Sequence, residues 1–148
     1  MTIKEWLSRY LVMERKIRDV DSDIEMLLAT AGSGGSGDGS PRGNATSDPT
    51  GRIASNLADL QAWRSGLRSL AFSVRAEIES VINGIEDPEL SDLLFDRYLI
   101  GLSWDEITED LGKASVVYVR GKMHAQALSE AELVLTRRGN SLAISAQR

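Results

Sequence analysis

The chain has 148 residues, 42% of them hydrophobic, so it holds one domain or one domain and an extension. Its formal net charge of −5 disfavours broad, non-specific binding to nucleic acid. It contains no cysteine, which excludes a disulfide framework and thiolate metal sites. No apolar run approaches the roughly 18 to 20 residues of a membrane span, and the start "MTIKEWLSRY" lacks signal-peptide character, so we expect a cytoplasmic protein without membrane contact.

The first predicted element is a long helix. Its apolar residues alternate at spacings of three and four through four heptads. They are Ile3, Trp6, Tyr10, Met13, Ile17, Val20, Ile24 and Leu27. Charged residues fill the positions between them, which is the pattern of a coiled coil. An amphipathic helix packed on a globular core is the alternative interpretation.

The segment 31–51 separates this helix from the next. It contains seven of the 13 glycines, two of the three prolines and almost nothing apolar. Such a segment buries too little surface to offset the entropy lost on ordering. We therefore interpret it as a flexible Gly/Ser-rich linker.

The heptad spacing resumes after the linker. Its members are Ile53, Leu57, Leu60, Leu67, Ala71, Val74, Ile78, Val81 and Ile85, with Arg64 as the one polar interruption. A second helix of this length can run back along the first, which predicts a long antiparallel, coiled-coil-like helical hairpin over residues 1–86. Trp63, Leu70 and Phe72 lie off the seam, so we expect docking of the C-terminal helices or self-association into a dimer or higher homo-oligomer.

Three shorter helices are predicted over residues 87–128. Their expected caps are Asp87, Ser103 and Ser115 at the starts and Gly101 and Gly112 at the ends. Ser103 and Glu106 have the spacing of a capping box, which defines a very short middle helix. A helix, a very short helix, a turn and a third helix make a helix-turn-helix. The predicted fold is therefore all-α: the hairpin, this small C-terminal domain, and a tail over 129–148 without an assigned role.

The third helix holds the candidate binding residues. A helical wheel places Val116, Val119, Met123 and Ala127 inward and Tyr118, Lys122 and Ala125 outward, with Arg120 and His124 on one flank. The candidate DNA-binding residues are Lys113, Ser115, Tyr118, Arg120, Gly121, Lys122 and His124. Tyr118 has packing against a partner helix as its alternative role, and His124 that of a solvated polar residue.

The charge near this helix is low for a DNA-binding protein. Between Ser103 and Leu128 there are four acidic residues and three basic ones. Phosphate contacts supply most non-specific affinity, so a monomer would bind weakly and a dimer would double the cations.

The run "LFDRYLIGLSWDEITEDLG" resembles region 4 of bacterial sigma factors. With the long paired helices before it, the chain resembles a family of small phage and prophage proteins of unassigned function, related to phage late-gene transcription activators. The resemblance implies a DNA-binding transcriptional regulator in a bacterial host cell. Relatives usually carry a dense basic run in the third helix and a turn one residue shorter, so this chain departs from the family where DNA would be bound.

Two other functions remain open on the sequence alone. One is a protein-interaction module that contacts RNA polymerase or another phage protein instead of DNA. The other is a DNA-packaging subunit similar to small terminases. No nucleophile–base pair or metal cluster is recognisable, so we expect no enzyme activity, no cofactor and no metal site.

Overall fold

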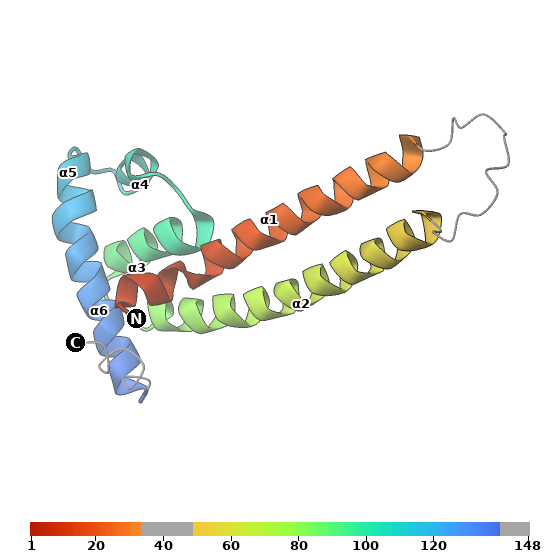
Figure 1. Cartoon of the computed structure of the whole chain (residues 1–148). Helices are drawn as coiled ribbons and strands as arrows, with labels where there is room; N and C mark the ends of the chain where they lie inside the picture. Colours follow the sequence, from red (N-terminus) through yellow and green to blue (C-terminus); the bar gives the residue numbers. More distant parts are fainter. Residues whose placement is uncertain (34–48, 140–148) are drawn as a thin grey trace, which may run out of the picture. The chain divides into compact units, whose positions relative to one another are not determined.

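The structure is a computed structural model that describes residues 1–33 and 49–139. Every regular element in these ranges is helical, which confirms the all-α prediction (Figure 1). The elements are α1 (Ile3–Ser33), α2 (Pro49–Asn83), α3 (Pro88–Phe95), η2 (Asp96–Ile100), α4 (Trp104–Asp110), α5 (Val116–Tyr118), η3 (Val119–Met123) and α6 (His124–Arg137). None of these helices is both long and apolar enough to cross a bilayer.

The chain forms two compact units. One comprises Met13–Leu70, and the other comprises Met1–Val12 together with the chain from Ala71 onward. The boundary between the units therefore falls inside both long helices. The domain limits expected at residues 86 and 128 stay predictions.

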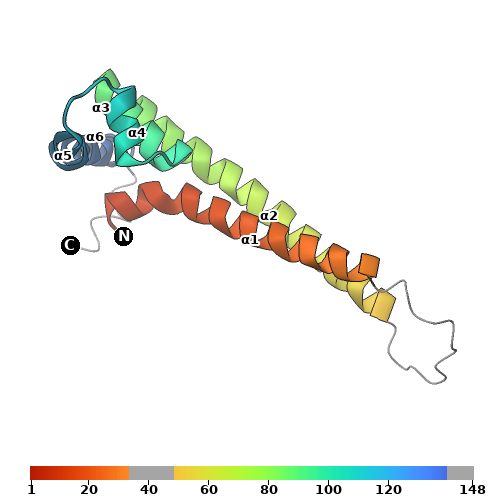
Figure 2. The same cartoon turned by 90° about the horizontal axis from the view of Figure 1, so that it is seen from above.

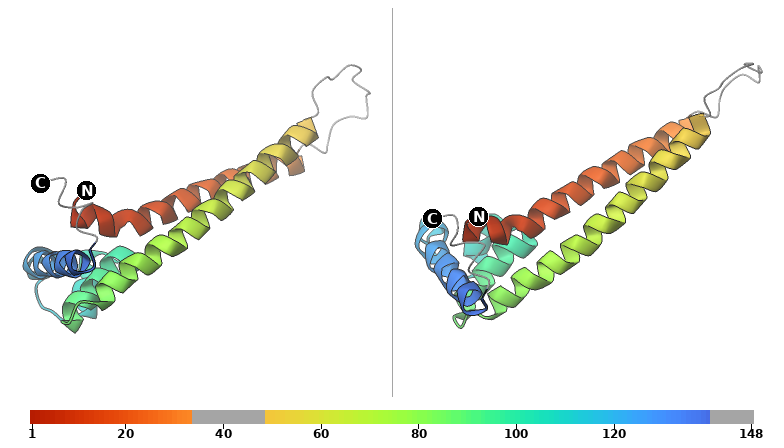
Figure 3. Two further views of the ribbon diagram at one scale, coloured as in Figure 1. Left: turned by 90° about the horizontal axis from the view of Figure 1, so that it is seen from below. Right: turned by 60° about the horizontal axis from the view of Figure 1, so that its bottom comes forward.

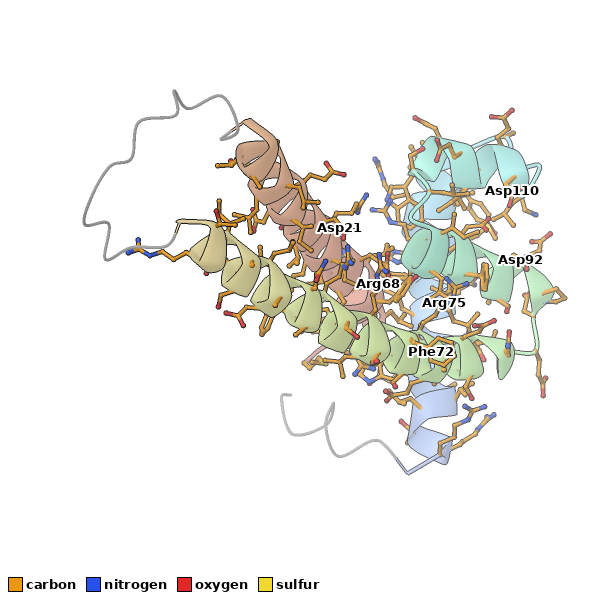
Figure 4. The ribbon with its side chains drawn as sticks, turned by 90° about the vertical axis from the view of Figure 1, so that its right-hand side faces the viewer. Asp21, Arg68, Phe72, Arg75, Asp92 and Asp110 are labelled. Carbon is orange, nitrogen blue, oxygen red and sulfur yellow. The ribbon has the colours of Figure 1, made fainter. Side chains whose placement is uncertain are left out.

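In the Met13–Leu70 unit, α1 and α2 lie side by side and run in opposite directions (Figures 2 and 3). Ile17, Val20 and Ile24 of α1 are buried. Arg64, the polar interruption of the second heptad run, places Nη1 3.1 Å from Asp21 Oδ1. Arg68 Nη2 lies 3.9 Å from Asp21 Oδ2 (Figure 4). One carboxylate of α1 therefore pairs with both arginines.

The predicted bounds of the linker, 31–51, are wrong at both ends. The helix α1 continues through Ser33, and α2 begins at Pro49. Proline suits a first helical turn because its fixed φ is helical and its missing N–H would have no partner there. Alanine has the highest helix propensity, so Ala31 favours another residue of α1. Residues 34–48 of the predicted linker lie outside the described residues.

The second unit has its own core. The core side chains come from α1, α2, α3, α4, η3 and α6. Fully buried are Leu7, Ile78, Val81, Ile82, Leu93, Leu94, Ile107, Val119 and Leu135. The helix that begins at Pro88, α3, packs on both η2 and α6.

The predicted caps of the three shorter helices are confirmed. The Asp87 carboxylate accepts a hydrogen bond from the Glu89 N–H at 2.9 Å. The capping box of Ser103 and Glu106 is complete in both directions. At the helix ends, Gly101 and Gly112 have φ of +87° and +66°, in the left-handed region that glycine tolerates.

The third helix is longer than predicted. Its helical conformation continues past Leu128, where we expected it to end, to Arg137. Ala131, Val134 and Leu135 follow Ala127 at helical spacing and are buried. This continued apolar stripe gives the extra turns a surface to pack on. The first nine residues of the predicted tail are therefore part of the helix.

Candidate nucleic-acid interface

The third helix contains a wider, π-helical turn that the sequence did not predict. This turn, η3, spans Val119–Met123 and joins α5 to α6 without a break. It carries three candidate DNA-binding residues, Arg120, Gly121 and Lys122. π-helical turns occur frequently at functional sites, so this turn is a candidate binding surface.

Most of the candidate residues do reach the surface. Ser115, Tyr118, Arg120, Gly121 and Lys122 are all exposed. Nothing lies within 4 Å of the position that a Cβ on Gly121 would occupy. Packing against the part of the chain that the structure describes therefore does not explain a residue that costs a helix about 1 kcal/mol relative to alanine.

Ser115 also stabilises the start of the third helix. Its Oγ accepts a hydrogen bond from the Tyr118 N–H at 3.2 Å. The hydroxyl thus caps the start of the third helix and satisfies a backbone donor that would otherwise be orphaned. The cap fixes the direction in which the helix leaves the turn.

Lys113 is engaged in an ion pair. Its Nζ lies 3.0 Å from Glu89 Oε2 and donates a hydrogen bond to Oε1 at 3.1 Å. The pair connects the turn before the third helix to the first turn of α3. Because Glu89 already compensates this charge, Arg120 and Lys122 are the cations from 113 to 128 that form no ion pair within the described residues.

The prediction that His124 contacts DNA, or is a solvated polar residue, is wrong. His124 is only 8% exposed, and its Nε2 shares a hydrogen bond with the Tyr98 hydroxyl at 2.7 Å. A π-helical turn advances each residue by a smaller angle than an α-turn, so η3 rotates His124 from the flank of the regular wheel toward the core. Burial, aided by the charges of Lys4 and Arg97, lowers the pKa of His124 to about 4. The ring is therefore neutral at pH 7.

Trp104 joins the short helix to the third helix. Its ring meets the His124 ring edge-on with centroids 4.7 Å apart. The Arg97 guanidinium lies 4.5 Å from the Trp104 ring and donates a hydrogen bond to the Leu102 carbonyl at 3.1 Å. We name Arg97, Tyr98, Trp104 and His124 the aromatic joint. Because its members come from η2, α4 and α6, the aromatic joint fixes the angle between these helices.

Asp96 is a second buried polar group at the same place in the fold. It is 7% exposed, and its Oδ2 has no hydrogen-bond partner within the described residues. Burial raises the pKa of Asp96 to about 7, and the neighbouring Asp110 and Asp92 add to the rise. Nothing in the sequence distinguishes Asp96 from the exposed acids around it, since its burial depends on how α4 packs.

The side of α4 that faces solvent is acidic. Asp105, Glu106, Glu109 and Asp110 are all exposed. They outnumber the cations near the start of the third helix, as the sequence indicated. Within residues 1–33 and 49–139, no three His, Asp or Glu side chains gather in the way that metal ligands do.

Comparisons with protein-family models, with curated proteins and with solved structures found no match.

Proposed function

We propose that the chain is a DNA-binding transcriptional regulator of a phage or prophage, active in the cytoplasm of the bacterial host. The observation that carries this proposal is the way the seven-residue α4 is held. Its capping box defines the start, Gly112 defines the end, and Trp104 packs on His124. The third helix is thereby presented with Tyr118 and the η3 cations toward solvent.

In this proposal α3 with η2, α4, and α5 through α6 form a helix-turn-helix, and the third helix enters the major groove. Arg120 and Lys122 contact phosphates, and Lys113 does so when Glu89 releases it. Tyr118 reaches a base edge or a thymine methyl. Gly121 lets a phosphate approach the helix backbone, and Ser115 orients the first turn. The resemblance to sigma factor region 4 supports this assignment.

The long helices complete the proposal. The paired segments of α1 and α2 form an antiparallel, coiled-coil-like hairpin through which the protein dimerises. Two copies double the number of phosphate contacts, which compensates for the few cations on each third helix.

The test is DNA binding measured by fluorescence anisotropy, with phage promoter fragments and random duplexes, from about 50 to 200 mM salt, the range in which phosphate contacts lose most affinity. Lys122→Ala should weaken binding to all duplexes alike and reduce the salt slope by about 1 per site. Tyr118→Ala should weaken the preferred sequence more than random DNA. Lys16→Ala, at an exposed position of α1, is the matched control and should change neither.

The proposal fails if the wild-type protein binds no duplex at the lowest salt. A specific observation then favours the protein-interaction module. Val117 is 67% exposed beside exposed Tyr118, while Lys113 is paired and His124 is neutral. This surface is apolar enough to bind RNA polymerase or another phage protein. Loss of RNA polymerase capture by Tyr118→Ala, without any DNA binding by the wild type, would support that second function.

A further inference from the structure

One face of α2 in the Met13–Leu70 unit is apolar and has no partner among the described residues of the unit. Trp63 and Leu70 are seven residues apart, so they lie on the same side of the helix. They are 58% and 56% exposed. Gly66 lies between them, and nothing is within 4 Å of the position that its Cβ would occupy. Two large apolar side chains and a helix-weakening glycine thus lie on the surface, and packing against residues 1–33 and 49–139 does not account for them.

The face is uncharged at Trp63, Gly66 and Leu70, and Asp59, one turn before Trp63, is the exposed charge that precedes it on the same side of the helix. The ten residues Gln61–Leu70 include only Arg64 and Arg68 as charged residues, and both pair with Asp21. By contrast, the ten residues 14–23 of α1, in the same unit, include seven charged residues. A solvated helix face is normally charged. The uncharged face of α2 is therefore typical of a surface that becomes buried.

The heptad residues with which α1 faces α2 cannot be the surface that a partner buries. Ile17, Val20 and Ile24 are already buried where α1 lies beside α2. Trp63 and Leu70 of α2, in contrast, remain exposed and available for a partner.

The spacing of the face makes it complementary to itself. Trp63 precedes Gly66 by three residues, and Leu70 follows it by four. If two α2 helices cross antiparallel with a two-fold axis near Gly66, Trp63 of each copy meets Leu70 of the other. Such an isologous contact pairs residue i with j and j with i. Since glycine lacks a side chain, the two backbones can approach closely at the axis.

We propose that a second copy of this chain occupies the Trp63–Gly66–Leu70 face in an antiparallel, two-fold symmetric dimer. Because no charge on the face demands an oppositely charged partner, an identical face is sufficient. This inference rests on the dimerisation part of the proposed function and is independent of DNA binding. An interface of about three helical turns falls below about 1,200 Å², the lower limit of standard interfaces, so the dimer should dissociate reversibly on dilution.

The first experiment is sedimentation of the full-length protein without DNA over a wide range of concentration. The wild type should show a reversible monomer–dimer equilibrium, and Leu70→Glu should raise the dissociation constant at least about tenfold because a charge would be buried without a partner. Leu133→Glu, at an α6 position that is 48% exposed, is the control and should leave the equilibrium unchanged. Trp63→Ala provides a second, uncharged variant, and circular dichroism checks that each variant stays helical.

The second experiment tests the direction of the two helices. Because the chain has no cysteine, a single Gly66→Cys substitution under mild oxidation should give a disulfide-linked dimer. Ser55 lies three turns away, about 16 Å along the helix on nearly the same side. Ser55→Cys should not cross-link in an antiparallel pair, because a disulfide needs Cα atoms within about 7 Å. It would cross-link in a parallel pair.

Each outcome is decisive. A monomeric wild type overturns both this inference and the proposed dimerisation, whereas DNA binding is measured separately. A dimer that survives Leu70→Glu and Trp63→Ala overturns the face alone. Cross-linking of Ser55→Cys, or none by Gly66→Cys in a dimeric protein, overturns the antiparallel register. A dimer weakened by both face variants and cross-linked only at position 66 supports the proposal.

Discussion

Replacing the buried carboxyl of Asp96 by the isosteric amide should make the protein more stable, and the gain should grow with pH. Burial and the neighbouring acids hold the folded-state pKa of Asp96 at about 7, whereas its unfolded-state pKa is about 3.9. Between these values the folded protein binds the proton more tightly than the unfolded chain does. The wild type therefore loses stability as pH rises from about 4 to 7, and the loss is complete above about 7.

The size of the effect follows from the pKa difference. One pKa unit corresponds to 1.36 kcal/mol, so the two units between pH 5 and 7 give an upper limit of about 2.7 kcal/mol. Asp96→Asn removes this titration. The difference in unfolding free energy between the variant and the wild type should thus increase by about 1 to 2.7 kcal/mol from pH 5 to pH 8. Any fixed packing change caused by the amide cancels in this comparison.

Urea denaturation at both pH values measures the difference. Asp105→Asn removes the charge of an exposed acid on α4 and serves as the control for loss of a surface charge. Asp110→Asn should reduce the wild-type pH dependence without abolishing it, because burial is the largest cause of the shift and Asp110 adds to it. Equal gains for Asp96→Asn at pH 5 and pH 8 would refute the reasoning, as would a carboxyl resonance of Asp96 that titrates below about pH 5.

His124 should act in the opposite direction: its folded-state pKa of about 4 lies below the usual value, so stability is lost as pH falls from about 6.5 to 4, and His124→Gln in the Asp96→Asn background should abolish that slope in denaturation titrations. Two glycine-to-alanine variants should differ in sign by thermal melting. Gly121→Ala should stabilise by about 0.5 to 1 kcal/mol, whereas Gly84→Ala should destabilise by about 1 to 3 kcal/mol, since its Cβ would lie 2.8 Å from Val134 Cγ1; equal signs would contradict the contacts described. Ser103→Ala should cost about 1 kcal/mol through loss of the capping box, and an unchanged melting temperature would show that α4 is held by packing alone.

The helix caps were predictable from the sequence because their causes are local. The side chain of Ser103 reaches a backbone N–H only three residues away. Gly112 adopts the left-handed backbone at the end of α4 without steric strain, whatever surrounds it. The end of the third helix could also have been predicted from the sequence. Ala131, Val134 and Leu135 continue the apolar spacing, and the prediction stopped too early by ending the stripe at Leu128.

The positions of His124 and Asp96 could not be predicted in the same way. A helical wheel assumes 100° per residue, and the π-helical turn η3 breaks this assumption just before His124. Such a turn forms because tertiary packing outweighs the regular hydrogen bonds, and no residue type in the sequence predicts it. The burial of Asp96 likewise depends on the placement of α4. Both residues lie at the junction of the helices, where long-range contacts decide the structure.

The aromatic joint explains why so short a helix is so fully specified. Seven residues are too few for a helix to persist alone in water, so α4 needs its capping box, its terminal glycine and the Trp104 contact to exist. In return, α4 gives Trp104 a fixed position against His124, while Tyr98 ties the same ring to η2. The angle of the third helix is thus set by side chains that are buried or partly buried. In the proposed regulator, positioning and DNA contact belong to different residues: the aromatic joint sets the geometry, and Tyr118, Arg120 and Lys122 make the contacts.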